Sequence, residues 1–328
     1  MSSAANVRIH ESQFPENVRR DLLDSLRTRQ VNHKFHYDSF KQTQKWLALH
    51  EAFSPSRKTA DVAETYDAAF HAAAEILKFP RVHLIGLGCG GGQKDRRFLQ
   101  MLAAKRGEIF YTPCDVSVAM TLVARKSALS VVPEKNCFPT VCDLATARDL
   151  PEFFGADRVA EAARVFTFFG MIPNFEPRMI LPKLASLLES GDLLLFSANL
   201  APGKSYQSGM EKILPQYENQ LTRDWLFNFL LDLGIQRDSG EMRFQIEDDP
   251  AGTGLKRVAA WFHFSKPEQI KIGDNLFRFE PGEKIRLFFS CRHTPELVGK
   301  MVSEHGLRVC NQWIACSEEE GVFLLAKN

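Results

Sequence analysis

Short apolar runs alternate with helix-like segments in the middle of the chain, between residues 60 and 200. Such runs are typical of buried strands, and their alternation with helices is typical of an α/β domain with a parallel sheet. Helical spacing is clear over 94–104 and over 179–188, which ends near a potential left-handed cap at Gly191. The runs that predict strands are Val82–Leu87, Ile109–Cys114, Phe138–Val141, Val165–Phe169 and Leu193–Ser197.

The pattern is different on both sides of this region. The first 58 residues are polar and helix-like, with a helix opening at Pro15, and we interpret them as an appendage outside the core. After Pro202-Gly203, one helix is predicted over 217–233 and is followed by strand-like runs, which is typical of an α+β lobe. The runs are Met242–Ile246, Val258–Phe264, Ile270–Ile272, Leu276–Phe279 and Ile285–Ser290.

The alternation returns at the end of the chain. Thr294 can cap a helix that has Pro295 at its first position and Gly306 after its last turn. The runs Leu307–Ala315 and Gly321–Ala326 follow as a strand pair. The tail is therefore predicted to rejoin the α/β domain.

Composition narrows the class of protein. The 328 residues are 45% hydrophobic and 25% charged, which excludes a disordered chain and allows two domains. The formal charge is +1 and long runs of like charge are lacking, so the sequence does not indicate a surface that binds nucleic acid. No apolar run approaches the roughly 18 residues of a membrane span, and the first residues lack an apolar signal core. We expect a soluble, cytoplasmic protein without a nucleic-acid or membrane partner.

The seven cysteines include no C-x-x-C pair, and most lie in apolar runs. We expect them to be reduced and buried, like small apolar residues. The nine histidines do not fall at ligand spacing beside them, so no metal site is predicted.

A glycine-rich turn, Gly86-Leu87-Gly88-Cys89-Gly90-Gly91-Gly92, joins the first predicted strand to a helix. Glycine is needed where the backbone turns sharply or approaches a ligand, and the N-terminus of the next helix presents free N–H groups. The spacing Gly86-x-Gly88-x-x-Gly91 also fits a dinucleotide fingerprint. The turn alone does not separate a nicotinamide cofactor from S-adenosylmethionine, nor either from a plain tight turn.

Two aspartates follow the next two predicted strands. Asp115 ends one strand and Asp143, followed by Leu144, ends the other. The carboxyl ends of parallel strands face one crevice, so Asp115 is placed to accept hydrogen bonds from ribose hydroxyls and Asp143 from an adenine amino group. The alternative for each is a helix N-cap.

These residues, in this order, resemble the histidine-specific S-adenosylmethionine-dependent methyltransferases. The resemblance covers most of the chain and includes four further segments: Gln93-Lys94, Lys34–Asp38, Ala52–Arg57 and Phe168–Asn174. It implies a class I methyltransferase Rossmann-like sheet with an additional α+β substrate-binding lobe, and it implies S-adenosylmethionine as the cofactor. The methyltransferase domain is expected over 59–200 plus 290–328, and the substrate-binding lobe over 10–58 plus 201–289.

The resemblance also assigns residues. The implied cofactor-binding residues are Gly88, Cys89, Gly90, Lys94, Asp115, Asp143, Leu144 and Gly170. Asn174 would hold the α-amino group of an amino acid, and Tyr37 and Tyr217 would hold its carboxylate side. Simpler roles are a solvated lysine at Lys94, a loop cap at Asn174 and ring packing at Tyr217.

The substrate pocket departs from the family pattern. Where the family places a glutamate and a serine two residues apart to bind imidazole, this chain has Phe288 and Ser290. Phe53 replaces a tyrosine, and Ala260 replaces a larger residue. A phenyl ring does not accept an imidazole N–H bond, so a wider, more apolar pocket is predicted. The alternative is that Phe288 is a core residue.

We therefore expect an N-methyltransferase that acts on the α-amino group of an amino acid or derivative more apolar than histidine. Three alternatives stay open: a histidine Nα-methyltransferase, a nucleotide-binding oxidoreductase and a non-catalytic cofactor-binding regulator. No catalytic residue is assigned, because neither His36 nor His50 is persuasively placed as a base. The oligomeric state is left unassigned.

Overall fold

The computed structural model describes residues 4–53, 59–77, 79–105, 107–156 and 159–328. The chain folds into two compact units. The first comprises 1–14, 55–200 and 294–328, and the second comprises 15–54 and 201–293. Residues 54–57, part of the Ala52–Arg57 segment, lie outside the described residues.

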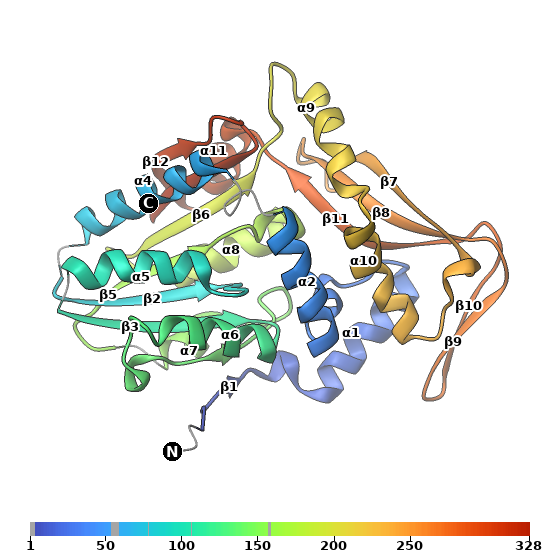
Figure 1. Cartoon of the computed structure of the whole chain (residues 1–328), viewed down its shortest axis with the longest axis horizontal. Helices are drawn as coiled ribbons and strands as arrows, with labels where there is room; N and C mark the ends of the chain where they lie inside the picture. Colours follow the sequence, from blue (N-terminus) through green and yellow to red (C-terminus); the bar gives the residue numbers. More distant parts are fainter. Residues whose placement is uncertain (1–3, 54–58, 78, 106, 157–158) are drawn as a thin grey trace. The chain divides into compact units, whose positions relative to one another are not determined.

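The first unit is built on an eight-stranded sheet with the order β1-β4-β3-β2-β5-β6-β13-β12 (Figure 1). Strands β1 to β6 run parallel, and β13 runs antiparallel to both of its neighbours. This topology confirms the predicted α/β fold of the class I methyltransferase type. The strands are β1 (Arg8–Ile9), β2 (Arg81–Leu87), β3 (Glu108–Asp115), β4 (Thr140–Val141), β5 (Ala163–Phe168), β6 (Leu193–Asn199), β12 (Leu307–Ile314) and β13 (Glu320–Lys327).

Helices cover this sheet. Helices α4, α5 and α6 pack in sequence and contact β13, β2 and β3, respectively, while α8 contacts both α7 and α11. Ser117 caps α6 by accepting from Met120 N–H at 3.3 Å, and Thr294 caps α11 by accepting from Leu297 N–H at 3.2 Å. The helices are α4 (Ala60–Ile76), α5 (Gln93–Lys105), α6 (Val118–Ala128), α7 (Leu150–Gly155), α8 (Pro177–Leu187) and α11 (Pro295–Glu304), with 3-10 turns η1 (Glu11–Gln13), η3 (Glu134–Asn136) and η4 (Ile172–Asn174).

The second unit combines helices with a three-stranded antiparallel sheet, β11-β8-β7, and a hairpin, β9-β10. The strands are β7 (Gly240–Asp248), β8 (Lys256–Phe264), β9 (Glu268–Ile272), β10 (Asn275–Phe279) and β11 (Lys284–Arg292). The helices are α1 (Pro15–Thr28), α2 (Phe40–Phe53), α9 (Tyr206–Ile213) and α10 (Gln220–Asp232), with 3-10 turns η2 (His33–His36), η5 (Leu214–Tyr217) and η6 (Arg237–Ser239).

Three local expectations are wrong. The N-terminal segment is not an appendage, because Leu26, Val31 and Phe35 are buried in the core of the second unit. The helix expected over 217–233 begins only at Gln220, because the Asn219 side chain caps it by accepting from Thr222 N–H at 2.9 Å. The cysteines are all free, but Cys310 and Cys316 are exposed and Cys89 is half-buried.

Candidate functional site

The glycine-rich turn lies between the end of β2 and the start of α5. Gly88 and Gly92 have φ angles of +68° and +70°, in the left-handed region that favours glycine. A Cβ on Gly92 would lie 2.8 Å from the Cα of Ala124 in α6, so a larger residue would push the turn off that helix. The glycines therefore hold a tight turn against the helix layer, at the carboxyl end of the sheet (Figure 1).

Asp115 connects this turn to the end of β3. One carboxylate oxygen accepts from Gly90 N–H at 2.9 Å, and the other accepts from Ser117 N–H at 3.0 Å. Burial raises the pKa of Asp115 to about 6, and the backbone N–H groups act in the opposite direction. Ser117 is the N-cap of α6, so Asp115 does not have the alternative capping role. An ionised carboxylate has about four acceptor positions, which leaves room for two ribose hydroxyls.

Asp143 and Leu144 follow β4, next to β3 in the sheet, and both are buried. The Asp143 carboxylate accepts from Ala145 N–H and from Thr146 Oγ1, each at 2.9 Å. These bonds form a local turn, while the next helix begins at Leu150 with Asp149 as its N-cap, so the alternative of a helix cap at Asp143 is wrong.

Lys94 lies in the first turn of α5 and is not simply solvated. Its Nζ lies 2.7 Å from the Tyr66 hydroxyl and 3.4 Å from Glu320 Oε1, and Tyr66 donates a hydrogen bond to the same carboxylate. Tyr66 and Glu320 are buried, and burial raises the pKa of Tyr66 well above its usual range, so it stays protonated. The lysine is thus held at the end of the sheet by a partly buried ion pair.

Gly170 follows β5 and has a φ of +67°, and its N–H donates to Ser197 Oγ at 2.8 Å. Asn174 ends the short turn η4, and the N-cap position of α8 is Glu176, so Asn174 does not begin that helix. A Cβ on Gly88 would lie 2.4 Å from Met171 Sδ, which places the segment after β5 against the glycine turn. Cys89 lies in that turn, and burial raises the pKa of its thiol.

The structure thus brings the predicted cofactor residues to the carboxyl ends of four neighbouring strands, β4, β3, β2 and β5. Their chemistry suits an adenosine derivative: carboxylates for hydroxyl and amino groups, glycines that leave the backbone accessible, and a lysine for a carboxylate.

The second unit carries most of the predicted substrate residues. The Tyr217 hydroxyl donates to Ser290 Oγ at 2.9 Å and accepts from Arg292 Nη2 at 3.1 Å. Tyr217 therefore does more than pack its ring. Arg292 is buried and was missed from the sequence, although its position two residues after Ser290 places both on one face of β11.

Phe288 and Ala260 are cross-strand partners in β11 and β8. Phe288 stacks on His33 with a centroid distance of 4.9 Å, and its edge meets Trp225 at 5.5 Å. Both predicted residues are buried in the hydrophobic core of the second unit, next to these aromatic rings, and Ala260 is fully buried. Since Phe288 and Ser290 are two residues apart on β11, they lie on one face of the strand.

Tyr37 reaches the same cluster, because its ring lies 5.5 Å from that of Trp225. Phe53 is the last residue of α2 and is half exposed. Burial lowers the pKa of His36 to about 4, so this histidine is neutral at pH 7, and its Nε2 donates to the Leu287 carbonyl at 2.7 Å. His50 stacks on Trp46 at 4.7 Å.

Asp95 is a further buried carboxylate that the sequence analysis did not single out. It accepts from the Tyr111 hydroxyl and from Thr167 Oγ1, each at 2.8 Å, and burial raises its pKa to about 6. A Cβ on Gly86 would lie 2.1 Å from its Oδ2, so Gly86 is the residue that admits Asp95 beneath the turn. Its position three residues after Gly92, on the buried side of α5, was the available signal.

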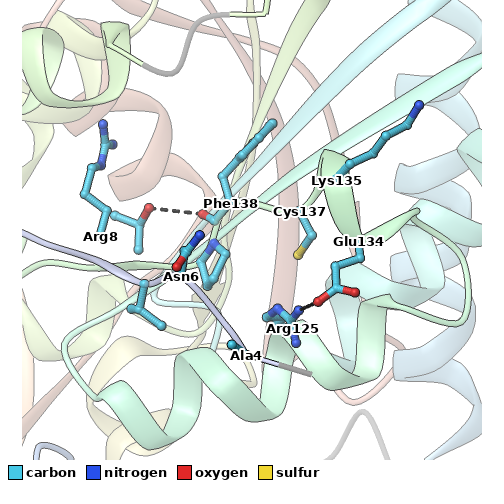
Figure 2. A pocket seen from close by; sticks show the side chains of 11 residues that line it. Ala4, Asn6, Arg8, Arg125, Glu134, Lys135, Cys137 and Phe138 are labelled. Carbon is cyan, nitrogen blue, oxygen red and sulfur yellow. Dashed lines mark hydrogen bonds and ion pairs between the residues drawn. The ribbon is translucent and has the colours of Figure 1, made fainter. Parts of the chain in front are cut away.

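A pocket of about 530 Å³ lies elsewhere in the first unit, beside β1 and β4 (Figure 2). Arg125 forms an ion pair with Glu134 at its edge. None of the predicted cofactor residues lines it. Over the described part of the chain, there is no group of three or more metal-ligating side chains, and no helix is long and apolar enough to cross a membrane.

Comparison with known proteins gives matches at two levels. A family model described as histidine-specific methyltransferase, SAM-dependent, matches residues 18–327. The N-methyltransferase imqF of Aspergillus flavus is 25% identical over 248 residues, which cover 73% of this chain and 65% of that protein. The match thus spans about 65% of the length of this curated relative.

Solved structures with a similar fold include an S-adenosylmethionine-dependent methyltransferase from Clostridium acetobutylicum, with a TM-score of 0.45 and 12% identity over 87% of this chain and 98% of that chain. They also include the magnesium protoporphyrin IX methyltransferase of Synechocystis, solved with bound SAH, with a TM-score of 0.46 and 10% identity over 90% of this chain and 98% of that chain.

Proposed function

Since the chain belongs to the family of histidine-specific, S-adenosylmethionine-dependent methyltransferases, we propose that it methylates the α-amino nitrogen of an amino acid or amino-acid derivative more apolar than histidine. Membership in the family confirms the predicted enzyme class and the predicted cofactor. The alternative of a nucleotide-binding oxidoreductase is set aside for the same reason.

The observation that carries the cofactor part of the proposal is the pair of hydrogen bonds that the Asp115 carboxylate accepts from Gly90 N–H and Ser117 N–H. They fix a carboxylate beside the glycine turn, where it would accept hydrogen bonds from ribose hydroxyls. Asp143 and Leu144 would hold the adenine, and Lys94 would lie near the carboxylate of the methionine part. Gly88, Cys89, Gly90 and Gly170 would supply accessible backbone around the same ligand.

When bound, S-adenosylmethionine supplies a methyl group on a sulfonium, a leaving group that is already activated. The protein then has to orient the acceptor nitrogen and keep its lone pair free of a proton. The name of the imqF relative, an N-methyltransferase, supports nitrogen as the acceptor. In the proposal, Asn174 binds the α-amino group, while Tyr37 and Tyr217 bind the carboxylate side of the substrate.

The preference for an apolar side chain follows from what surrounds Phe288. By the resemblance, this ring takes the position of the family's acid, and its neighbours are Ala260, Trp225 and the neutral ring of His33, whose pKa is held well below its usual range by burial. An imidazole would lose a hydrogen-bond acceptor there, whereas an aromatic side chain would bury its surface at about 25 cal/mol per Å² before binding costs. Tryptophan is our leading candidate.

Two measurements on the purified full chain test the proposal. S-adenosylhomocysteine should raise the unfolding temperature and NAD should not, because a ligand that binds only the native state stabilises it. A mass-spectrometric screen of the free amino acids with S-adenosylmethionine should then give N-methylation of an aromatic amino acid in preference to histidine. Efficient trimethylation of histidine would refute the substrate preference, and binding without any methylation would support the alternative of a non-catalytic regulator.

A further inference from the structure

Ser12 forms a hydrogen bond to the turn that carries Asp143. Its Oγ accepts from the Asp143 backbone N–H at 3.0 Å, and both residues are buried. The family model begins to match at residue 18, so this contact comes from a segment that precedes the match. A residue outside the shared family region thus holds a residue that we assign to the cofactor.

His10 holds Ser12 in place. Its Nδ1 lies 2.9 Å from Ser12 Oγ, and its Nε2 lies 2.8 Å from Asp149 Oδ1 at the start of α7. The edge of its ring meets Phe153 with a centroid distance of 4.7 Å. His10 is buried and links the Ser12 hydroxyl to Asp149, the N-cap residue of α7, and to the ring of Phe153.

The backbone of the same segment is part of the sheet. Strand β1 pairs in parallel with β4, and the His10 N–H donates to the Val141 carbonyl at 2.9 Å. Asp143 comes two residues after Val141, and its carboxylate is already engaged by Ala145 and Thr146. Residues of the same turn thus fix the Asp143 carboxylate, and Ser12 fixes the Asp143 backbone N–H.

We propose that Ser12, held by His10, is a positioning residue that fixes the Asp143 carboxylate for recognition of the amino group of adenine. This inference rests on the proposed function, which assigns Asp143 to that group. It makes the N-terminal segment part of the cofactor site without placing it in contact with the cofactor. Ser12 acts through the turn that carries Asp143. Its loss should therefore weaken the binding of the adenine amino group.

The test compares two ligands by calorimetry: S-adenosylhomocysteine and S-inosylhomocysteine, in which an oxo group replaces the adenine amino group. The wild-type chain should bind the adenosine compound about tenfold or more tightly, as expected for a hydrogen bond to a charged acceptor. Ser12→Ala should reduce this preference by about threefold to tenfold, mainly by weakening the binding of S-adenosylhomocysteine. A general loss of structure would instead weaken the binding of both ligands equally and leave the preference unchanged.

His10→Phe keeps the ring against Phe153 but removes both nitrogen contacts, and it should reduce the preference in the same direction. Ser303→Ala is the matched control, because Ser303 is exposed and its hydroxyl donates only within α11, to the Lys300 carbonyl. A preference within twofold of wild type in both Ser12→Ala and His10→Phe would overturn the inference. So would a wild-type chain that binds both ligands equally.

Hydrogen exchange on the wild-type chain tests the same inference without variants, in case the variants fail to fold. On addition of S-adenosylhomocysteine, peptides covering 8–14 and 141–147 should gain protection together, because Ser12 couples the two segments. Protection of 141–147 with no change in 8–14 would contradict the role of Ser12. A wild-type chain that does not bind S-adenosylhomocysteine would instead refute the proposed function and the inference with it.

Discussion

The hydroxyl of Tyr217 donates a hydrogen bond to Ser290 Oγ at 2.9 Å, although the two residues lie 73 positions apart in the chain. Arg292 donates to the same hydroxyl at 3.1 Å. Three polar groups therefore meet at the face of β11 that also carries Phe288. A partly buried cluster of this kind is suited to bind the polar end of an amino acid.

Tyr217→Phe should raise KM for the amino-acid substrate and leave the affinity for S-adenosylhomocysteine unchanged. The substitution keeps the ring but removes the hydroxyl that contacts Ser290 and Arg292 and that, in the proposal, binds the carboxylate side of the substrate. Loss of one hydrogen bond to the substrate at about 1 kcal/mol corresponds to about fivefold in KM. Steady-state kinetics and calorimetry give the two quantities separately. Weaker binding of S-adenosylhomocysteine with an unaltered KM would contradict the assignment of Tyr217 to the substrate.

The sequence predicted the strand ends of the first unit because each lies at a clear change of pattern. The run Val82–Leu87 leads into the glycine-rich turn, and the next two runs lead to Asp115 and Asp143. Parallel strands then bring these ends together whatever the details of packing. The site residues that immediately follow a strand were therefore accessible to sequence reasoning.

The contacts between distant segments were not accessible in this way. Tyr66 meets Glu320 across 254 positions, and nothing local to either residue signals the other. Ser12 was hidden in a segment whose polar composition suggested an appendage. Leu26 shows why that interpretation failed: one buried face on a mostly polar helix is enough to join a core.

Phe288→Glu should raise kcat/KM for histidine relative to kcat/KM for tryptophan. A carboxylate at this position would supply the acceptor for an imidazole N–H, and it would leave an aromatic competitor beside a charge. Competition assays with both amino acids, read by mass spectrometry, give the ratio of kcat/KM. Phe288→Leu is the control for loss of the ring, and it should lower both activities without reversing the preference. An unchanged ratio in Phe288→Glu would indicate that Phe288 is only a core residue.

Binding of S-adenosylhomocysteine should weaken as the pH falls through about 6. The pKa of Asp115 is raised from its ordinary value of 3.8 to about 6 by burial, so its carboxylate gains a proton in that range and loses acceptor capacity. At pH 5 only about one tenth of the groups stay ionised, which weakens binding by about tenfold. Asp115→Asn should bind more weakly at pH 8 and should show a flatter pH dependence.

Asp95 is the control for this pH dependence, because its pKa is also raised to about 6 but its carboxylate faces Tyr111 and Thr167. The Asp95→Asn variant should still lose affinity for S-adenosylhomocysteine as the pH falls below 6. For stability, the sign is opposite to that of a salt-bridged acid. The folded state holds more protons than the unfolded state between about pH 4 and 6, so both groups make folding less favourable as the pH rises.

Tyr66→Phe should weaken the binding of S-adenosylhomocysteine by releasing Lys94. The Tyr66 hydroxyl lies 2.7 Å from Lys94 Nζ and donates to Glu320, so its removal leaves a buried carboxylate with one partner fewer. We expect a loss of about 1–3 kcal/mol in the free energy of unfolding and a rise of about threefold to tenfold in Kd, because the lysine is no longer held near the proposed cofactor site. Calorimetry and denaturant unfolding measure the two effects. Tyr206→Phe removes another hydroxyl, one that donates to the Arg292 carbonyl in the second unit, and it should leave this Kd unchanged. A Tyr66→Phe variant that is less stable but binds S-adenosylhomocysteine normally would show that the ion pair only supports the fold.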